Sequence, residues 1–273
     1  MSAREYIFAD QDHRAEQERL DRQAGLLDPL TERLFGDAGL QPGMRVLDLG
    51  SGGGHVAQLA ARIVGPEGSV MGVEQDPEAA ASAQQRLRAL GLENVEILAG
   101  DAQTLDGVEG GFDAVVGRVI LMYVSDPVEA IRQAARRLRP GGILVMHEGD
   151  MTYDWTAPPS PLWQQVQGWF LQTLERAGVE PRMGLRLYET YVRAGLPGPH
   201  LALAAMTVGG PEAFAWGWAN VIKAVVPLME RLGVTTAAEV DGDTLADRLL
   251  AEVEARDGIV IGPPMVGAWV TVG

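Results

Sequence analysis

The chain has 273 residues, of which 47% are hydrophobic, and its formal net charge at pH 7 is −15. This length suits one large domain with a substantial insertion, and the acidic balance argues against nucleic-acid binding, because phosphates would be repelled. Since the chain contains no cysteine, disulfides, thiolate metal sites and cysteine nucleophiles are excluded.

The N-terminal segment is polar and charged, and it lacks the pattern of a secretory signal peptide. Apolar residues at helical spacing over residues 15–35 predict one or two helices, broken near Asp28-Pro29. No apolar run is long enough to cross a membrane. The sequence therefore predicts a cytoplasmic protein without membrane insertion.

The stretch RVLDLGSGGGHVA, residues 45–57, combines a strand pattern, a glycine-rich turn and the beginning of a helix. Its glycines let the main chain turn sharply and approach a ligand closely, and the helix N-terminus offers free N–H groups. A dinucleotide is one candidate ligand, because Gly52, Gly54 and Ala57 match the dinucleotide spacing in a late register. The stretch predicts a nucleotide-binding site.

Four more strand patterns follow, and polar residues stand where two of them end. Glu74 ends the second strand, ~20 residues past the glycines, which is where a ribose-binding carboxylate is expected. The third strand ends at Gly100-Asp101-Ala102. Strands that alternate with helices predict a parallel sheet whose carboxyl edge binds ligands. The predicted strands after the first are residues 70–74, 95–99, 112–116 and 143–147.

Residues after 150 are predicted to form a mainly helical insertion and two last strands. Most tryptophans in this region suit packing between helices, but their clustering after the fifth strand also fits a concave, apolar substrate pocket. Helices are predicted at residues 161–178, 183–194, 212–232 and 244–255, and strands at 201–208 and 259–272, the latter interrupted by Gly262-Pro263-Pro264.

Five motifs occur in a fixed order: VLDLGSGGG, VEQD, GDA, FDAVVGR and LRPGG. In this order and spacing the chain resembles the class I S-adenosylmethionine (SAM)-dependent methyltransferases, most of all the ubiquinone/menaquinone-biosynthesis type and related bacterial small-molecule enzymes. The resemblance is strong over residues 41–150 and looser after 183. It implies an α/β, Rossmann-like, seven-stranded sheet of order 3-2-1-4-5-7-6, with the last strand antiparallel and with a helical lid and insertions.

The same resemblance implies a division of the single globular domain into three parts. Residues 1–40 would form the lid, with an ordinary helix packed on the domain as the alternative. Residues 41–150 would form the SAM-binding core. Residues 151–273 would supply the helices that cover the substrate and complete the core sheet.

The resemblance also implies SAM as cofactor and S-adenosylhomocysteine as product. Glu74 would bind both ribose hydroxyls, Gln75 would lie beside the adenine, and Asp101 would accept a hydrogen bond from the adenine amino group. Caps of a helix or turn are the alternative for the two acids. The remaining expected cofactor residues are Tyr6, Asp48, Gly50, Ser51, Gly52, Gly54 and Ala102, with Phe8 as a further lid contact.

Arg118 stands in an otherwise apolar run that should lie between cofactor and substrate. It could bind the methionine carboxylate of the cofactor or a substrate anion, and in that case it would count among the cofactor residues. A structural pairing with Asp48 or Asp113 is the alternative.

Methyl transfer from a sulfonium needs alignment more than covalent help, and positioning can supply ~7–11 kcal/mol of a barrier. His147 is the best candidate for a base, because its free pKa is near neutral and it ends a strand. A structural hydrogen bond there is the alternative, and Glu148, Asp150 and Tyr123 are further candidates for the base. No set of metal ligands has convincing spacing, so no metal is expected.

We therefore expect a SAM-dependent methyltransferase that acts on O, N or C of a hydrophobic small molecule. Secondary metabolism is one pathway type in which it could act, and a homodimer is one possible oligomeric state. A SAM-binding protein of the same fold with non-methylating chemistry is the alternative, and an NAD-dependent oxidoreductase is the third candidate.

Overall fold

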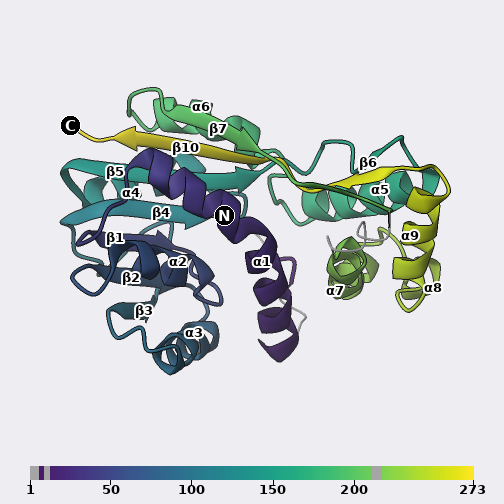
Figure 1. Ribbon diagram of the computed structural model, residues 1–273, viewed down its shortest axis with the longest axis horizontal. Helices are drawn as coiled ribbons and strands as arrows, with labels where there is room; N and C mark the ends of the chain where they lie inside the picture. Colours follow the sequence, from purple (N-terminus) through teal and green to yellow (C-terminus); the bar gives the residue numbers. More distant parts are fainter. Residues whose placement is uncertain (1–5, 9–12, 211–216) are drawn as a thin grey trace.

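A computed structural model describes residues 6–8, 13–210 and 217–273, and a seven-stranded sheet lies at its centre (Figure 1). The strand order is β3-β2-β1-β4-β5-β10-β7, and β10 runs antiparallel to both of its neighbours. Numbered within this sheet alone, the order is 3-2-1-4-5-7-6, which confirms the predicted topology. The strands are β1 (Arg45–Leu49), β2 (Ser69–Glu74), β3 (Val95–Ala99), β4 (Phe112–Arg118), β5 (Leu138–Gly149), β7 (His200–Ala204) and β10 (Met265–Thr271).

Helices cover both faces of this sheet, because its central strands are apolar on both sides. On one face, α1 (His13–Ala38), α2 (His55–Val64) and α3 (Pro77–Ala89) pack against alternate residues such as Val46. On the other face, α4 (Pro127–Arg137) and α6 (Met183–Arg193) pack against residues such as Leu47. The strand ends that carry the predicted site are thereby held in a rigid, two-sided core.

The N-terminal helix α1 runs without a break from His13 to Ala38, so the predicted break near Asp28-Pro29 is wrong. Pro29 lies inside the helix, and Figure 1 shows that the two halves of α1 point in different directions. A proline removes one helical hydrogen bond and crowds the preceding turn, which bends a helix that tertiary contacts hold on both sides. The second half packs the buried Leu34 and Phe35 on the sheet.

A second unit lies to the right of the sheet in Figure 1, beyond the end of β5. The predicted strand at 201–208 is two strands, of which only β7 joins the main sheet, and the predicted last strand divides at Gly262-Pro263-Pro264. Residues 211–216, the start of one predicted helix, lie outside the described residues. The unit consists of α5 (Pro161–Arg176), α7 (Trp218–Arg231), α8 (Ala237–Val240), α9 (Leu245–Glu254), β6 (Thr156–Ala157), β8 (Thr207–Gly209) and β9 (Ile259–Ile261).

Three tryptophans, Trp155, Trp163 and Trp218, lie in the core of the second unit. The rings of Trp155 and Trp218 stack with their centroids 3.7 Å apart, and Trp163 and Phe170 pack around Trp155. All four side chains are buried. The burial of these three tryptophans agrees with packing between helices, whereas Trp169 is only partly buried and Trp216 lies outside the described residues. Within the described residues, no helix has the length and apolar character needed to cross a membrane.

Candidate cofactor and substrate site

Three glycines of the turn after β1 have positive φ angles, +66° at Gly50, +50° at Gly52 and +78° at Gly54. A Cβ atom on Gly50 would overlap the Ile120 side chain, and one on Gly54 would lie 2.9 Å from Leu87 Cδ1. A Cβ on Gly52 would have only Leu20 within 4 Å, at 3.7 Å. Gly50 and Gly54 are thus required by packing, whereas Gly52 leaves bare main chain toward open space.

That open space is a cavity of about 470 Å³ at the carboxyl ends of β1, β2 and β4, beneath the first half of α1. Most of the predicted cofactor residues line it, whereas Asp48, Gly54, His147 and Glu148 do not. The predicted residues in its wall are Tyr6, Phe8, Gly50, Ser51, Gly52, Glu74, Gln75, Asp101, Ala102, Arg118 and Tyr123.

Several cavity residues were not predicted. Leu20 and Gln23 come from one face of α1, at the i, i+3 spacing that puts side chains side by side on a helix. His55 and Gln103 follow predicted motifs directly. Helical spacing over residues 15–35 was the signal for the first pair, but the direction in which that face points depends on the bend at Pro29.

One end of the cavity is acidic. Glu74 accepts hydrogen bonds from the main-chain N–H groups of Gly52 (2.8 Å) and Asp76 (3.0 Å). A carboxylate has about four acceptor positions, so Glu74 retains positions for two hydroxyl groups. Asp101 accepts from the N–H of Gln103 at 2.7 Å. The Gln103 side-chain oxygen in turn accepts from Ser125 Oγ at 2.8 Å, which joins two loops of the cavity wall.

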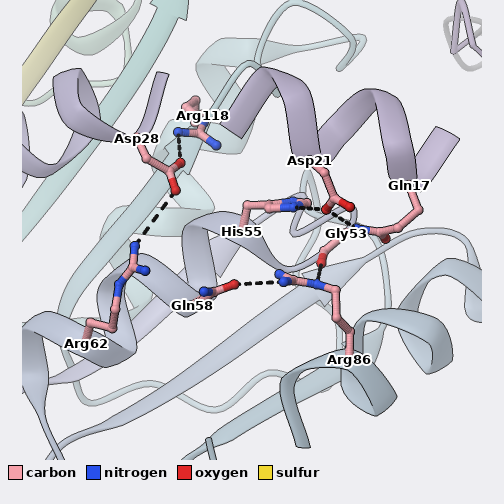
Figure 2. Close-up of polar contacts among 9 residues, drawn as sticks. All are labelled: Gln17, Asp21, Asp28, Gly53, His55, Gln58, Arg62, Arg86 and Arg118. Atoms are coloured by element: carbon pink, nitrogen blue, oxygen red, sulfur yellow. Dashed lines mark hydrogen bonds and ion pairs between the residues drawn. The ribbon is translucent and has the colours of Figure 1, made fainter. Parts of the chain in front are cut away.

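The cavity wall also carries a guanidinium group. Arg118 Nη1 donates to Asp28 Oδ1 (2.8 Å) and to Thr31 Oγ1 (2.9 Å), as Figure 2 shows for the aspartate. The structural pairing of Arg118 was suggested with Asp48 or Asp113 as an alternative, but its partner is Asp28 of α1, far away in the sequence. No described residue accepts a hydrogen bond from Arg118 Nε or Nη2. These nitrogens remain for a ligand in the cavity.

Two acids on α1 attach the helix to the core. Asp21 Oδ1 lies 2.7 Å from His55 Nε2 at the start of α2, and Asp28 lies between Arg118 and Arg62 (Figure 2). The acids are seven residues apart and so share a helix face. The first half of α1 is thereby held over the glycine turn.

Tyr6 and Phe8, which precede α1, form part of the cavity wall. Tyr6 Oη donates to Glu16 Oε1 at 2.5 Å, and both carboxylate oxygens of Glu16 accept from Arg19 at 2.7 Å. The Arg19 guanidinium lies 3.8 Å from the ring centroid of Phe8, and the Tyr6 ring packs edge-on against Tyr123. These contacts place the predicted lid residues Tyr6 and Phe8 against the cavity.

His147 lies under α1 rather than in the cavity wall, with a side chain that is 2% exposed. The Thr31 hydroxyl donates to Leu27 O (3.0 Å), so it can only accept from His147 Nδ1, which is 3.1 Å away. Burial and the nearby Arg118 lower the pKa of His147 to about 3. A neutral imidazole fixed in this way is poorly suited to be a base, so its position agrees with the structural alternative.

Glu148 is also buried, and it holds a loop. Its Oε1 accepts from the N–H groups of Ile120 (2.9 Å) and Leu121 (2.8 Å), which directly follow Val119. Val119 has φ +54°, a strained conformation for a β-branched residue that costs ~1–3 kcal/mol. Since Val119 and Ile120 line the cavity, Glu148 shapes the wall without reaching the space within.

Two buried carboxyl groups give the protein a predicted pH dependence. Burial raises the pKa of Asp48 and that of Glu148 to about 7 each, although Ser51 and Arg118 oppose the effect at Asp48, while Glu74 adds to it. Between about pH 4 and pH 7 the folded protein binds more protons at these groups than the unfolded chain, so their contribution to stability is lost as the pH rises through 7.

We therefore expect the free energy of unfolding to be lower at pH 8 than at pH 5.5 as far as these groups contribute. Urea unfolding at both pH values, at constant ionic strength, measures the difference. Asp48→Asn and Glu148→Gln should each reduce it. If both variants keep the pH dependence of the wild type, the pH dependence does not arise from Asp48 and Glu148.

Comparison with known proteins shows the family of the chain. A family described as "Methyltransferase domain" matches residues 40–177, half of the chain, and the chain belongs to this family. Among the described residues there is no group of three or more His, Cys, Asp or Glu that could hold a metal ion.

The curated relatives described here match less than half of the chain. The protein-L-isoaspartate O-methyltransferase of Ignicoccus hospitalis is 36% identical over 109 residues, which are 40% of this chain and 49% of that protein. The demethylmenaquinone methyltransferase of Listeria welshimeri is 31% identical over 127 residues, 46% of this chain and 51% of that protein. The chain thus spans about half the length of these relatives.

Solved structures match over more of the chain. The match to a SAM-dependent methyltransferase from Aquifex aeolicus extends over 97% of this chain and 100% of that protein, with a TM-score of 0.56 and 17% identity. The match to the [4+2]-cyclase SpnF extends over 90% of this chain and 81% of that protein, with a TM-score of 0.51 and 24% identity. At these identities the likeness shows the fold alone.

The family and fold imply SAM as the cofactor, and the cavity fits it. SAM carries two ribose hydroxyls in its adenosine part and an amino-acid carboxylate on the other side of the sulfonium. The acidic end at Glu74 and Asp101 suits the adenosine part, the bare main chain at Gly52 allows close approach, and the unused nitrogens of Arg118 suit the carboxylate.

Proposed function

We propose that this protein transfers a methyl group from SAM to O, N or C of a hydrophobic small molecule. The observation that supports this best is the division of the cavity wall. Its polar groups match the cofactor, whereas much of the remaining wall is apolar or aromatic: Tyr6, Phe8, Leu20, Val56, Val119, Ile120, Tyr123 and Val124. Apolar walls with few polar groups are typical of small-molecule sites.

Bound SAM supplies a methyl group that is already activated on a sulfonium. The contribution of the chain is then to align the acceptor and to keep water away, through the wall that Val119, Ile120 and Tyr123 form. Of the predicted catalytic residues only Tyr123 lines the cavity, and burial raises its pKa well above the usual value. Because Tyr123 keeps its proton at neutral pH, we infer an acceptor that loses its own proton readily.

The experiment is to incubate purified protein with SAM and a panel of hydrophobic phenols, amines and carbon acids, and to measure S-adenosylhomocysteine by mass spectrometry. Stoichiometric methylated product supports the proposal. Conversion of a substrate without S-adenosylhomocysteine would show non-methylating chemistry on the same fold. If neither SAM nor S-adenosylhomocysteine binds in calorimetry, both the methyl-transfer function and the non-methylating alternative are overturned.

We further propose that Arg118 binds the carboxylate of the cofactor. Arg118→Met keeps much of the apolar stem but removes the charge-assisted hydrogen bonds, each worth ~1.5–3 kcal/mol. We expect affinity for S-adenosylhomocysteine to fall about 10- to 100-fold. Affinity for 5′-methylthioadenosine, which lacks the amino acid, should stay unchanged. Equal losses for both ligands in calorimetry would instead indicate a structural role through Asp28 and Thr31.

A further inference from the structure

An uncovered apolar surface lies along the β7 side of the sheet. It consists of Leu185 (52% exposed), Tyr188 (51%) and Val192 (47%) on α6 and of Leu201 (51%) and Leu203 (69%) on β7, and we refer to it as the β7–α6 surface. Five large side chains so exposed amount to several hundred Å², which on a monomer is typical of an interaction site.

The five side chains lie on one side of the sheet. The Val266 side chain faces α6, because a Cβ on Gly184 would lie 3.0 Å from it. Leu203 is directly opposite Val266, so it points to the same face, and so does Leu201 two residues earlier. Tyr188 reaches Gly198 just before β7, which shows that the exposed row of α6 borders the strand.

The two edges of the sheet differ in their protection. At the β3 edge the Gln84 side chain donates to Val95 O (3.1 Å) and accepts from Ile97 N (2.8 Å), so main-chain groups are paired. On β7 no described residue outside β10 bonds to the main chain. Proteins normally protect an exposed edge strand with charges, bulges or a covering element. An edge strand with two exposed leucines therefore favours a partner.

We propose that the partner is a second copy of this chain, bound through the β7–α6 surface in a two-fold dimer. An antiparallel pairing of β7 with itself about Ala202 would set Leu201 opposite Leu203 of the second copy, so the surface is complementary to itself. The charge also fits. Although the whole chain carries −15, residues 183–204 contain two arginines and one glutamate, so two copies meet without acidic repulsion.

The test is sedimentation velocity of the full chain from about 1 to 100 µM. We expect the wild type to have twice the 29.2 kDa mass of one chain. Leu203→Glu should raise the dissociation constant at least about 100-fold. Leu90→Glu is the matched control, because Leu90 is 53% exposed beside α3 at the other edge, and it should remain dimeric.

Circular dichroism and thermal unfolding should show both variants folded. If Leu203→Glu does not fold, Leu185→Arg on the helix serves instead. A wild type that stays at the mass of one chain throughout the range overturns the proposal. So does a Leu203→Glu protein that remains dimeric, or a Leu90→Glu protein that dissociates equally.

Discussion

Replacing Gly52 by valine should abolish cofactor binding. Gly52 has φ +50° and exposes its main chain to the cavity, so the new side chain would occupy the space that a ligand needs. We expect affinity for S-adenosylhomocysteine to fall more than about 100-fold in calorimetry, a change of at least ~2.7 kcal/mol.

Backbone strain must be separated from this effect, because valine at positive φ costs ~1–3 kcal/mol wherever it occurs. Gly91→Val is the matched control. Gly91 has φ +75°, nothing within 4 Å of a Cβ, and lies after α3 outside the cavity wall. It should lose comparable stability and bind S-adenosylhomocysteine like the wild type. Normal binding by Gly52→Val would mean that the turn does not contact the cofactor.

Replacing Glu148 by alanine should strongly destabilise the protein. The buried N–H groups of Ile120 and Leu121 would lose their acceptor, at ~1–3 kcal/mol for each. We expect the free energy of unfolding to fall by ~2–4 kcal/mol in urea unfolding at pH 7. Turnover should fall as well, because the strained loop at Val119 would relax and the cavity wall would move.

Glu148→Gln is the control for this prediction, since its carbonyl oxygen can still accept from both N–H groups. It should retain most of the stability and of the turnover. If Glu148→Gln instead loses turnover while remaining as stable as the wild type, the carboxyl group itself takes part in catalysis. If Glu148→Ala is as stable as the wild type, the loop does not depend on this residue.

The parts of the fold and of the site that could be predicted are those that a short, continuous stretch of sequence determines. The glycine turn follows β1, Glu74 is the last residue of β2, and Asp101 comes shortly after β3, so their positions at one edge of a parallel sheet follow from the chain order. The cavity collects them as expected. The sheet order also followed, through the resemblance to a known family.

The features that could not be predicted depend on distant partners. Pro29 bends α1 instead of ending it, because its neighbour Asp28 is paired with Arg118, ninety residues away. The chemistry of His147 suggested a base. In the structure, however, His147 is buried under α1, where Thr31 holds it through a hydrogen bond. Aromatic residues after β5 suggested a pocket, but whether tryptophans face a ligand or one another depends on packing that local spacing does not encode.

The place of β10 in the sheet has a consequence for biosynthesis. β7 pairs only with β10 in the main sheet, yet residues 200–204 leave the ribosome some sixty residues before 265–271. During synthesis, β7 therefore has no partner strand in the main sheet while residues 205–264 are translated. β7 and β10 can join β5 only after residues 265–271 have been synthesised, so this half of the sheet matures after the half that β1 to β5 form.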